Sequence, residues 1–172
     1  MNKIRIVIIV LFLSMQSCTK EDADLRMAQF ETPIITGFKF LDNAGHSLGT
    51  YGIPNVKTSN NLAMEREIGF YAYPNPSIGT FRLNIITQNY SSPYYIWLVQ
   101  AKYEDNISYT PPYIANALYL KAGAAPVLQL ETREINPELD VRNIEQGYYR
   151  VYVKIQDEIY YDNIVITQLA NQ

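Results

Sequence analysis

The chain has few of the residue types on which many active sites depend. Its 172 residues include one cysteine (Cys18), one histidine (His46) and one tryptophan (Trp97). A single cysteine excludes an intramolecular disulfide, so packing alone must hold the fold. A zinc site made of His and Cys lacks its ligands, and carboxylates alone suit harder cations. We therefore expect neither a bound metal nor another cofactor.

No hydrophobic run is long enough to cross a bilayer. The apolar run Ile6–Leu13 is about half as long as the ~20 residues that a membrane-spanning helix needs. It follows Lys3 and Arg5 and is typical of the hydrophobic region of a secretory signal. We therefore expect export without a permanent transmembrane segment.

Basic side chains are also scarce. The chain has 14 Lys and Arg residues against 17 Asp and Glu residues, and Lys3 and Arg5 belong to the predicted signal. Without these two, 12 basic side chains remain and the net charge is −5. Because phosphate binding needs clustered Lys and Arg, this balance argues against a nucleic-acid partner and against a polybasic membrane-binding patch.

The pair Ser17-Cys18 resembles the lipobox of bacterial lipoproteins. This resemblance implies that residues 1–17 are removed and that Cys18 carries the lipid, such as palmitate, that anchors the protein in the outer membrane. Residues 18–29 are polar and charged and predict a flexible tether. Residues 19–22 also resemble the signal that sends some Bacteroidota lipoproteins to the cell surface, which slightly favours the surface over the periplasmic face. The alternative is an ordinary solvated linker.

The rest of the chain has the pattern of an all-β protein. Fifteen tyrosines fit the half-buried surfaces of strands, and turn signals separate short apolar segments. We predict an antiparallel β-sandwich over 62–172, preceded by a strand pair and linker over 30–61. The expected strands are 34–41, 46–51, 68–73, 80–87, 94–101, 127–131, 139–141, 147–155 and 159–167.

Three details of this prediction can be checked individually. The nearly continuous apolar run 94–101 indicates a strand covered on both faces, with Trp97 in the core. In 147–155, alternation puts Tyr149 and its i+2 neighbours on one face, opposite Arg150, Tyr152 and Lys154. Pro74 is expected to end the strand 68–73, because proline lacks a backbone donor.

Two stretches resemble the C-terminal sorting domain of type IX secretion cargo. One is the turn Tyr73-Pro74-Asn75-Pro76, followed by Gly79; the other is the strand that begins with Gly147 and Tyr149. The resemblance covers roughly residues 67–168 and implies an immunoglobulin-like β-sandwich. The Ala-rich middle, the last strand without Lys or Arg, and the predicted lipid anchor depart from that family. We therefore expect a related fold, used as a structural or docking module, with sorting activity as an alternative.

Candidate catalytic groups are sparse, and no enzyme is predicted. His46 is expected to be an exposed turn histidine, because no acidic partner is evident in the sequence. Asp157 and Glu158 fit a hairpin turn. A second acidic group is expected to form a solvated face, with weak Ca²⁺ ligation and glycosidase-type acid–base chemistry as alternatives; it consists of Glu131, Glu134, Glu138 and Asp140.

Tyrosines are the remaining candidates for binding. Tyr94, Tyr113, Tyr148 and Tyr152 are predicted to form an exposed strip, since aromatic faces stack on sugars and anchor protein interfaces. The alternative is that they cap the edges of the sandwich. The expected function is a non-enzymatic outer-membrane lipoprotein that binds an envelope protein, with glycan binding as the first alternative.

The lipid anchor gives the first testable prediction. Mass spectrometry of the protein from its native membranes should find an N-terminal peptide that begins at an acylated Cys18. Cys18→Ala should block both acylation and removal of residues 1–17. An unmodified thiol at Cys18 in the wild-type protein would overturn the predicted anchor.

Overall fold

The computed structural model describes residues 31–59, 68–88, 90–104 and 125–168. The predicted signal (1–17) and tether (18–29) lie outside these ranges. Within them, regular structure consists of strands, which confirms the all-β class, and no helix is long and apolar enough to cross a membrane. The strands are β1 (Ile34–Ile35), β2 (Gly37–Leu41), β3 (Ser47–Gly52), β4 (Gly69–Ile78), β5 (Thr80–Ile86), β6 (Tyr94–Gln100), β7 (Lys102–Tyr103), β8 (Leu128–Thr132), β9 (Glu138–Asp140), β10 (Gly147–Ile155) and β11 (Glu158–Thr167).

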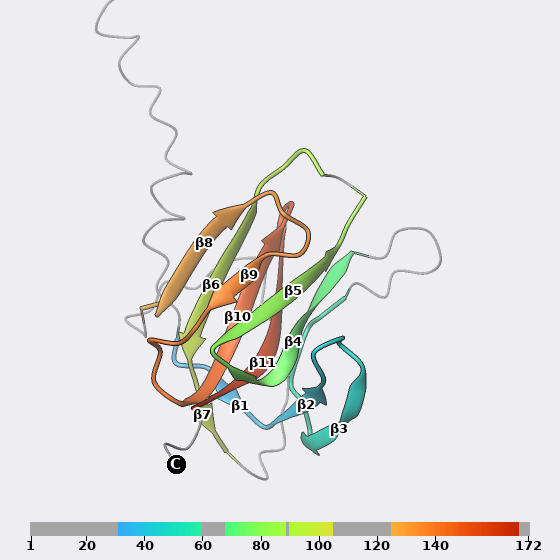
Figure 1. Ribbon diagram of the computed structural model, residues 1–172. Helices are drawn as coiled ribbons and strands as arrows, with labels where there is room; N and C mark the ends of the chain where they lie inside the picture. Colours follow the sequence, from blue (N-terminus) through green and yellow to red (C-terminus); the bar gives the residue numbers. More distant parts are fainter. Residues whose placement is uncertain (1–30, 60–67, 89, 105–124, 169–172) are drawn as a thin grey trace, which may run out of the picture.

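The strands form two facing layers (Figure 1). In one layer, β10 pairs antiparallel with β11 and β6, and β8 extends the layer beyond β6. In the other, β5 pairs antiparallel with β4 and β9. The layers are joined where the end of β4 runs parallel to β11, with Ser77 opposite Ile166. This arrangement is consistent with the predicted β-sandwich.

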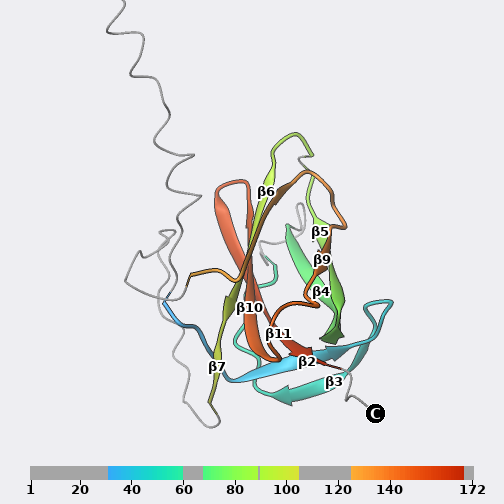
Figure 2. The same cartoon turned by 60° about the vertical axis from the view of Figure 1, so that its left-hand side comes forward.

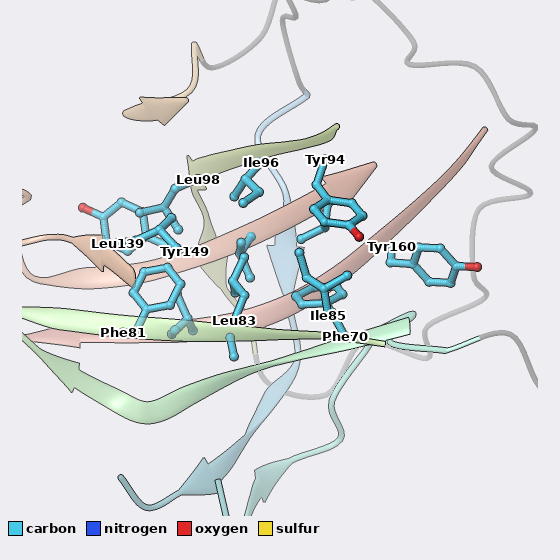
Figure 3. Packing of buried hydrophobic residues seen from close by; sticks show 14 of the residues in the cluster. Phe70, Phe81, Leu83, Ile85, Tyr94, Ile96, Leu98, Leu139, Tyr149 and Tyr160 are labelled. Carbon is cyan, nitrogen blue, oxygen red and sulfur yellow. The ribbon is translucent and has the colours of Figure 1, made fainter. Parts of the chain in front are cut away.

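A single apolar core fills the space between the layers (Figure 3). Phe81, Leu83 and Ile85 of β5 are at most 3% exposed and face side chains of β6 and β10. On β10, the alternate residues from Tyr149 to Ile155 are all buried, as the two-residue periodicity predicts.

Strand β6 is buried on both faces, as its continuous apolar sequence predicts. Ile96 and Leu98 point into the core between the layers. Trp97 and Val99 occupy the opposite face and are also fully buried. Trp97 lies between Tyr152 of β10 and Gln129 of β8 in the strand register.

The expectation that Pro74 ends a strand is wrong. β4 continues to Ile78 and changes partners along the way: it pairs with β5 as far as Tyr73 and again at Ile78, and with β11 at Ser77 and Ile78. Between these points Asn75 lies opposite Leu41 of β2. The prolines remove backbone donors without ending the strand, because the partner strand changes at that position.

The hairpin β2–β3 lies across one end of the sandwich (Figure 2). Its turn begins at Asp42, whose carboxylate accepts hydrogen bonds from the backbone N–H groups of Ala44 and His46, each at 2.8 Å. Gly45 takes a φ of 81°, which its lack of a side chain permits. An isolated hairpin is marginal in water, and this one is supported by its pairing with β4.

The buried tryptophan gives a prediction about stability. We expect Trp97→Ala to lower the free energy of unfolding by ~3–5 kcal/mol, because it removes a large, fully buried side chain. Chemical denaturation measures the change. Leu48→Ala is the control, since Leu48 is 70% exposed, and should change stability by about 0.5 kcal/mol or less. Equal effects of the two substitutions would contradict the placement of β6.

Candidate functional site

A buried polar network fixes the N-terminal segment on the outer face of β10 and β11. Arg150, only 6% exposed, donates from Nε to Asn163 Oδ1 at 3.0 Å. Its terminal nitrogen donates to the carbonyls of Ile34 (3.0 Å) and Asn55 (3.2 Å), and its guanidinium stacks on Tyr161. Alternation correctly placed Arg150 on the face opposite the core. It did not indicate that residues 34–55 cover that face.

Asn163 is the centre of this network. Its side-chain nitrogen donates to Gly37 O at 2.8 Å and to Asn55 Oδ1 at 2.9 Å. Its backbone carbonyl accepts a hydrogen bond from the Asn75 side chain at 2.9 Å. A fully buried amide is costly unless its polar atoms are bonded, so these contacts fix how the hairpin meets β4 and β11.

The hairpin positions an exposed edge. All six residues of β3 are exposed, and among the described residues β3 pairs only with β2. Leu48 is 70% exposed, Tyr51 is 47% exposed, and Ile53 just beyond the strand is 80% exposed. Exposed large apolar side chains along a sheet edge that has no partner among the described residues are unusual, because such edges readily pair with other chains.

One face of the hairpin carries a group of packed aromatic rings, which we call the aromatic cluster. Phe38 lies 5.1 Å from Phe40, 5.6 Å from Tyr51 and 6.2 Å from Tyr148, measured between ring centroids. Tyr103 of β7 stacks on Tyr148 at 5.0 Å and lies 5.7 Å from Tyr51. Phe38 is buried, whereas the other four rings keep some exposed surface. The cluster therefore joins the hairpin to the sandwich and reaches the surface beside β3.

The opposite face of the hairpin lines a pocket of about 330 Å³. Lys39 and Thr50 come from the hairpin, Tyr71 from β4 and Asp162 from β11. Asp162 is 5% exposed, and burial raises the pKa of its carboxyl to about 6. Hydrogen bonds from the backbone of Asn163 and Ala72, together with the positive charges of Lys39 and Arg150, oppose that increase.

The tyrosines predicted as one exposed strip are not brought together. Tyr94 is 1% exposed and points into the core, so its assignment to a binding surface is wrong (Figure 3). Tyr148 is half-buried in the aromatic cluster, and Tyr152 is half-buried against Tyr161 at 5.9 Å. Tyr113 lies outside the described residues. The sequence pattern placed Tyr94 on a strand, but it did not show that the face of the strand carrying Tyr94 would pack against the other layer.

The residues of the sorting-domain-like motifs have structural contacts. Asn75 Nδ2 donates to Asn163 O, and Asn75 Oδ1 accepts from Val165 N at 2.9 Å. The side chain of Asn75 thus bonds to β11 just before the ladder between β4 and β11 begins at Ser77. Tyr73 packs against Tyr71 at 5.5 Å.

The two glycines of these motifs lie at strand ends. Gly79 turns the chain with a φ of 84°, and Gly147 begins β10. Two residues after Gly147, the Tyr149 hydroxyl donates to the Glu145 carbonyl at 2.7 Å.

His46 has an acidic partner after all. Its Nδ1 lies 3.1 Å from Asp42 Oδ2, and its side chain is 79% exposed, as expected for a turn histidine. The pair comes from the turn itself, in which the Asp42 carboxylate folds back over its own loop. The only indication of this pair in the sequence is that Asp42 precedes His46 by four residues within a predicted turn.

The acidic side chains around β9 bind neighbouring arginines. Arg82 donates to Glu138 at 2.8 Å, and Arg142 contacts Asp140 at 2.5 Å and lowers the pKa of that carboxyl to about 2. Within the described ranges, no group of three or more His, Cys, Asp or Glu residues is arranged to hold a metal ion. Asp157 lies in the β10–β11 turn, and Glu158 begins β11.

Comparison of the chain with protein families, with curated proteins and with solved structures found no match.

The buried carboxyl of Asp162 predicts a pH dependence. Its folded-state pKa of about 6 exceeds the ordinary value of 3.8, so the folded protein binds more protons than the unfolded chain between these values. Stability should therefore fall as pH rises from about 4 to about 6, by up to ~3 kcal/mol from this group. Urea denaturation from pH 4 to 7 measures this change.

Asp162→Asn should remove the pH-dependent stability that Asp162 contributes. The free energy of unfolding of the variant, relative to wild type, should therefore be lowest at pH 4 and recover towards pH 7. Asp157→Asn is the control, because Asp157 is exposed in the hairpin turn. A constant difference between wild type and Asp162→Asn across this range would contradict the raised pKa.

Proposed function

We propose that the protein is a lipid-anchored β-sandwich of the outer membrane that acts as a protein-interaction module in a cell-envelope assembly. The signal-like residues 1–17 and Cys18 support the anchor, and residues 19–22 support the outer face. The observation that carries the interaction role is the exposed apolar edge of β3 beside the aromatic cluster. Leu48 and Tyr51 on the strand, and Ile53 just beyond it, are 47–80% exposed.

The same proposal includes kinship with the immunoglobulin-like sorting domains of type IX cargo. In immunoglobulin-like sandwiches, a tyrosine near the start of a strand hydrogen-bonds to the backbone a few residues upstream. The contact of Tyr149 with the Glu145 carbonyl supports that assignment. Asn75 is buried and bonded to β11, and Pro76 is half-buried. This favours a structural role for the Tyr-Pro-Asn-Pro segment over direct recognition by a sorting machinery.

Glycan binding is the second candidate, and one observation favours it. Three tyrosines of the aromatic cluster, Tyr51, Tyr103 and Tyr148, keep exposed surface and lie within one patch. Aromatic rings with a polar hydroxyl suit ligands that have both an apolar and a hydrated side. Binding on a glycan array that is lost in Tyr51→Ala would favour this candidate over protein interaction.

Site-specific crosslinking tests the protein-interaction role. A photo-crosslinking residue placed at Ile53 should capture a discrete envelope protein in the native cell. The same residue at Tyr90, which is 61% exposed but far along the chain from the hairpin, is the matched control and should not capture it. Cys18→Ala should abolish the captured product, because the protein would no longer reach the membrane. Identical products from Ile53 and Tyr90 would overturn the proposal.

A further inference from the structure

We propose that the free edge of β3 binds its partner by β-strand addition, and that the incoming strand alternates apolar with acidic side chains. This inference rests on the proposed interaction role and specifies its geometry and chemistry. Strand addition gives affinity through backbone hydrogen bonds and specificity through alternate side chains. The register of β3 with β2 shows which backbone groups and which side chains of β3 would meet an added strand.

The hydrogen-bond register identifies the backbone groups that face the free edge. Asp42 N donates to His46 O at 3.0 Å, and Ile53 N donates to Thr36 O at 3.1 Å. Both contacts lie between directly opposed residues at the two ends of the β2–β3 ladder, in which Lys39 lies opposite Thr50. In an antiparallel ladder, hydrogen-bonded residue pairs alternate with pairs that are not hydrogen-bonded to each other. Counting along the ladder from either end shows that Lys39 and Thr50 form a pair of the second kind. The N–H and C=O of Thr50 therefore point away from β2.

The edge also lacks two of the usual features that block strand addition, charged residues and proline. β3 has the sequence Ser-Leu-Gly-Thr-Tyr-Gly, with no charged residue and no proline. Natural edge strands are commonly protected by such residues or by bulges. The register shift opposite Phe40 and Leu41 places a bulge near Leu48. Residues 49–52 are paired one to one with β2, although Gly52 takes a φ of 64°. An added strand would pair with this stretch.

On the aromatic face, the edge presents apolar contacts. Tyr51 lies opposite Phe38, and Gly49 lies opposite Phe40. A Cβ atom built on Gly49 would meet nothing within 4 Å, so open space lies beside Gly49, which is opposite the half-buried Phe40 in the register. An apolar side chain of the incoming strand can occupy that space and contact Phe40 and Tyr51.

On the pocket face, the edge presents a positive charge. Lys39 is exposed and lies opposite Thr50 in the ladder. Neighbouring strands are about 4.8 Å apart, so a strand added beyond β3 lies roughly 10 Å from β2. The small side chain of Thr50 lets the long lysine side chain reach across it, and an acidic residue on that face of the incoming strand would meet its ammonium group. Alternate acidic and apolar residues therefore match the two faces.

Two synthetic heptapeptides provide the first test with the full-length protein in detergent. One alternates valine with glutamate, and the other alternates valine with lysine. Fluorescence anisotropy should show the glutamate peptide binding at least about tenfold more tightly than the lysine peptide. Lys39→Gln should reduce that preference to less than about threefold. Equal affinities for the two peptides in the wild-type protein would overturn the proposed charge complementarity.

Hydrogen exchange tests strand addition directly. The Thr50 amide should exchange at least about tenfold more slowly when the glutamate peptide is bound, because its N–H becomes hydrogen-bonded. Thr50→Pro should weaken binding at least about tenfold, whereas Thr50→Ser, which keeps the N–H, should bind like the wild type. Thermal unfolding shows whether the proline variant is folded, and the exchange experiment on the wild type needs no variant. Peptide binding without slower exchange at Thr50 would overturn the proposal.

The two proposals can fail separately. If the envelope protein captured at Ile53 is lost in Leu48→Ser but retained in folded Thr50→Pro, the apolar patch binds through side chains and strand addition is wrong. If nothing is captured at Ile53 although the glutamate peptide binds and protects Thr50, the edge is competent for strand addition but the proposed cellular role is wrong.

Discussion

The arrangement of this molecule depends on one buried side chain, Asn163. Its amide nitrogen bonds to the backbone of Gly37 and to Asn55, its amide oxygen accepts from Arg150, and its carbonyl accepts from Asn75. Four segments distant in the sequence therefore meet at one residue with no exposed surface. Because each unsatisfied buried polar group costs free energy, the segments are held in one mutual arrangement.

That arrangement explains why the hairpin β2–β3 presents a free edge. Asn163 and Asn55 fix the start of β2, and the aromatic cluster packs the hairpin against β7 and β10. β2 is thereby placed with one side toward β4 and the other toward β3. The exposed side chains of Leu48, Tyr51 and Ile53 are thus presented by a rigid support, which suits a recognition surface better than a mobile loop would.

The junction between the two layers has a related physical explanation. Pro74 and Pro76 cannot donate to a ladder, and β4 changes partners across them. The side chain of Asn75 supplies the donor and acceptor that the β11 backbone needs there. Three residues of the motif that resembles a sorting signal, Pro74, Asn75 and Pro76, therefore have structural roles in the fold.

Local sequence by itself determined most of the strands and their inward faces, but not the continuation of β4 beyond Pro74 or the short strand β7. Alternation along 81–85 and 149–155, and the continuous apolar run around Trp97, identified buried positions correctly because side-chain direction in a strand depends only on the two-residue period. Tertiary structure alone decided what covers each face. It buried Tyr94 between the layers, covered Arg150 with the N-terminal segment, and left β3 exposed. These outcomes depend on contacts between residues up to 126 positions apart, such as Asn163 with Gly37, and local periodicity contains no information about such distant partners.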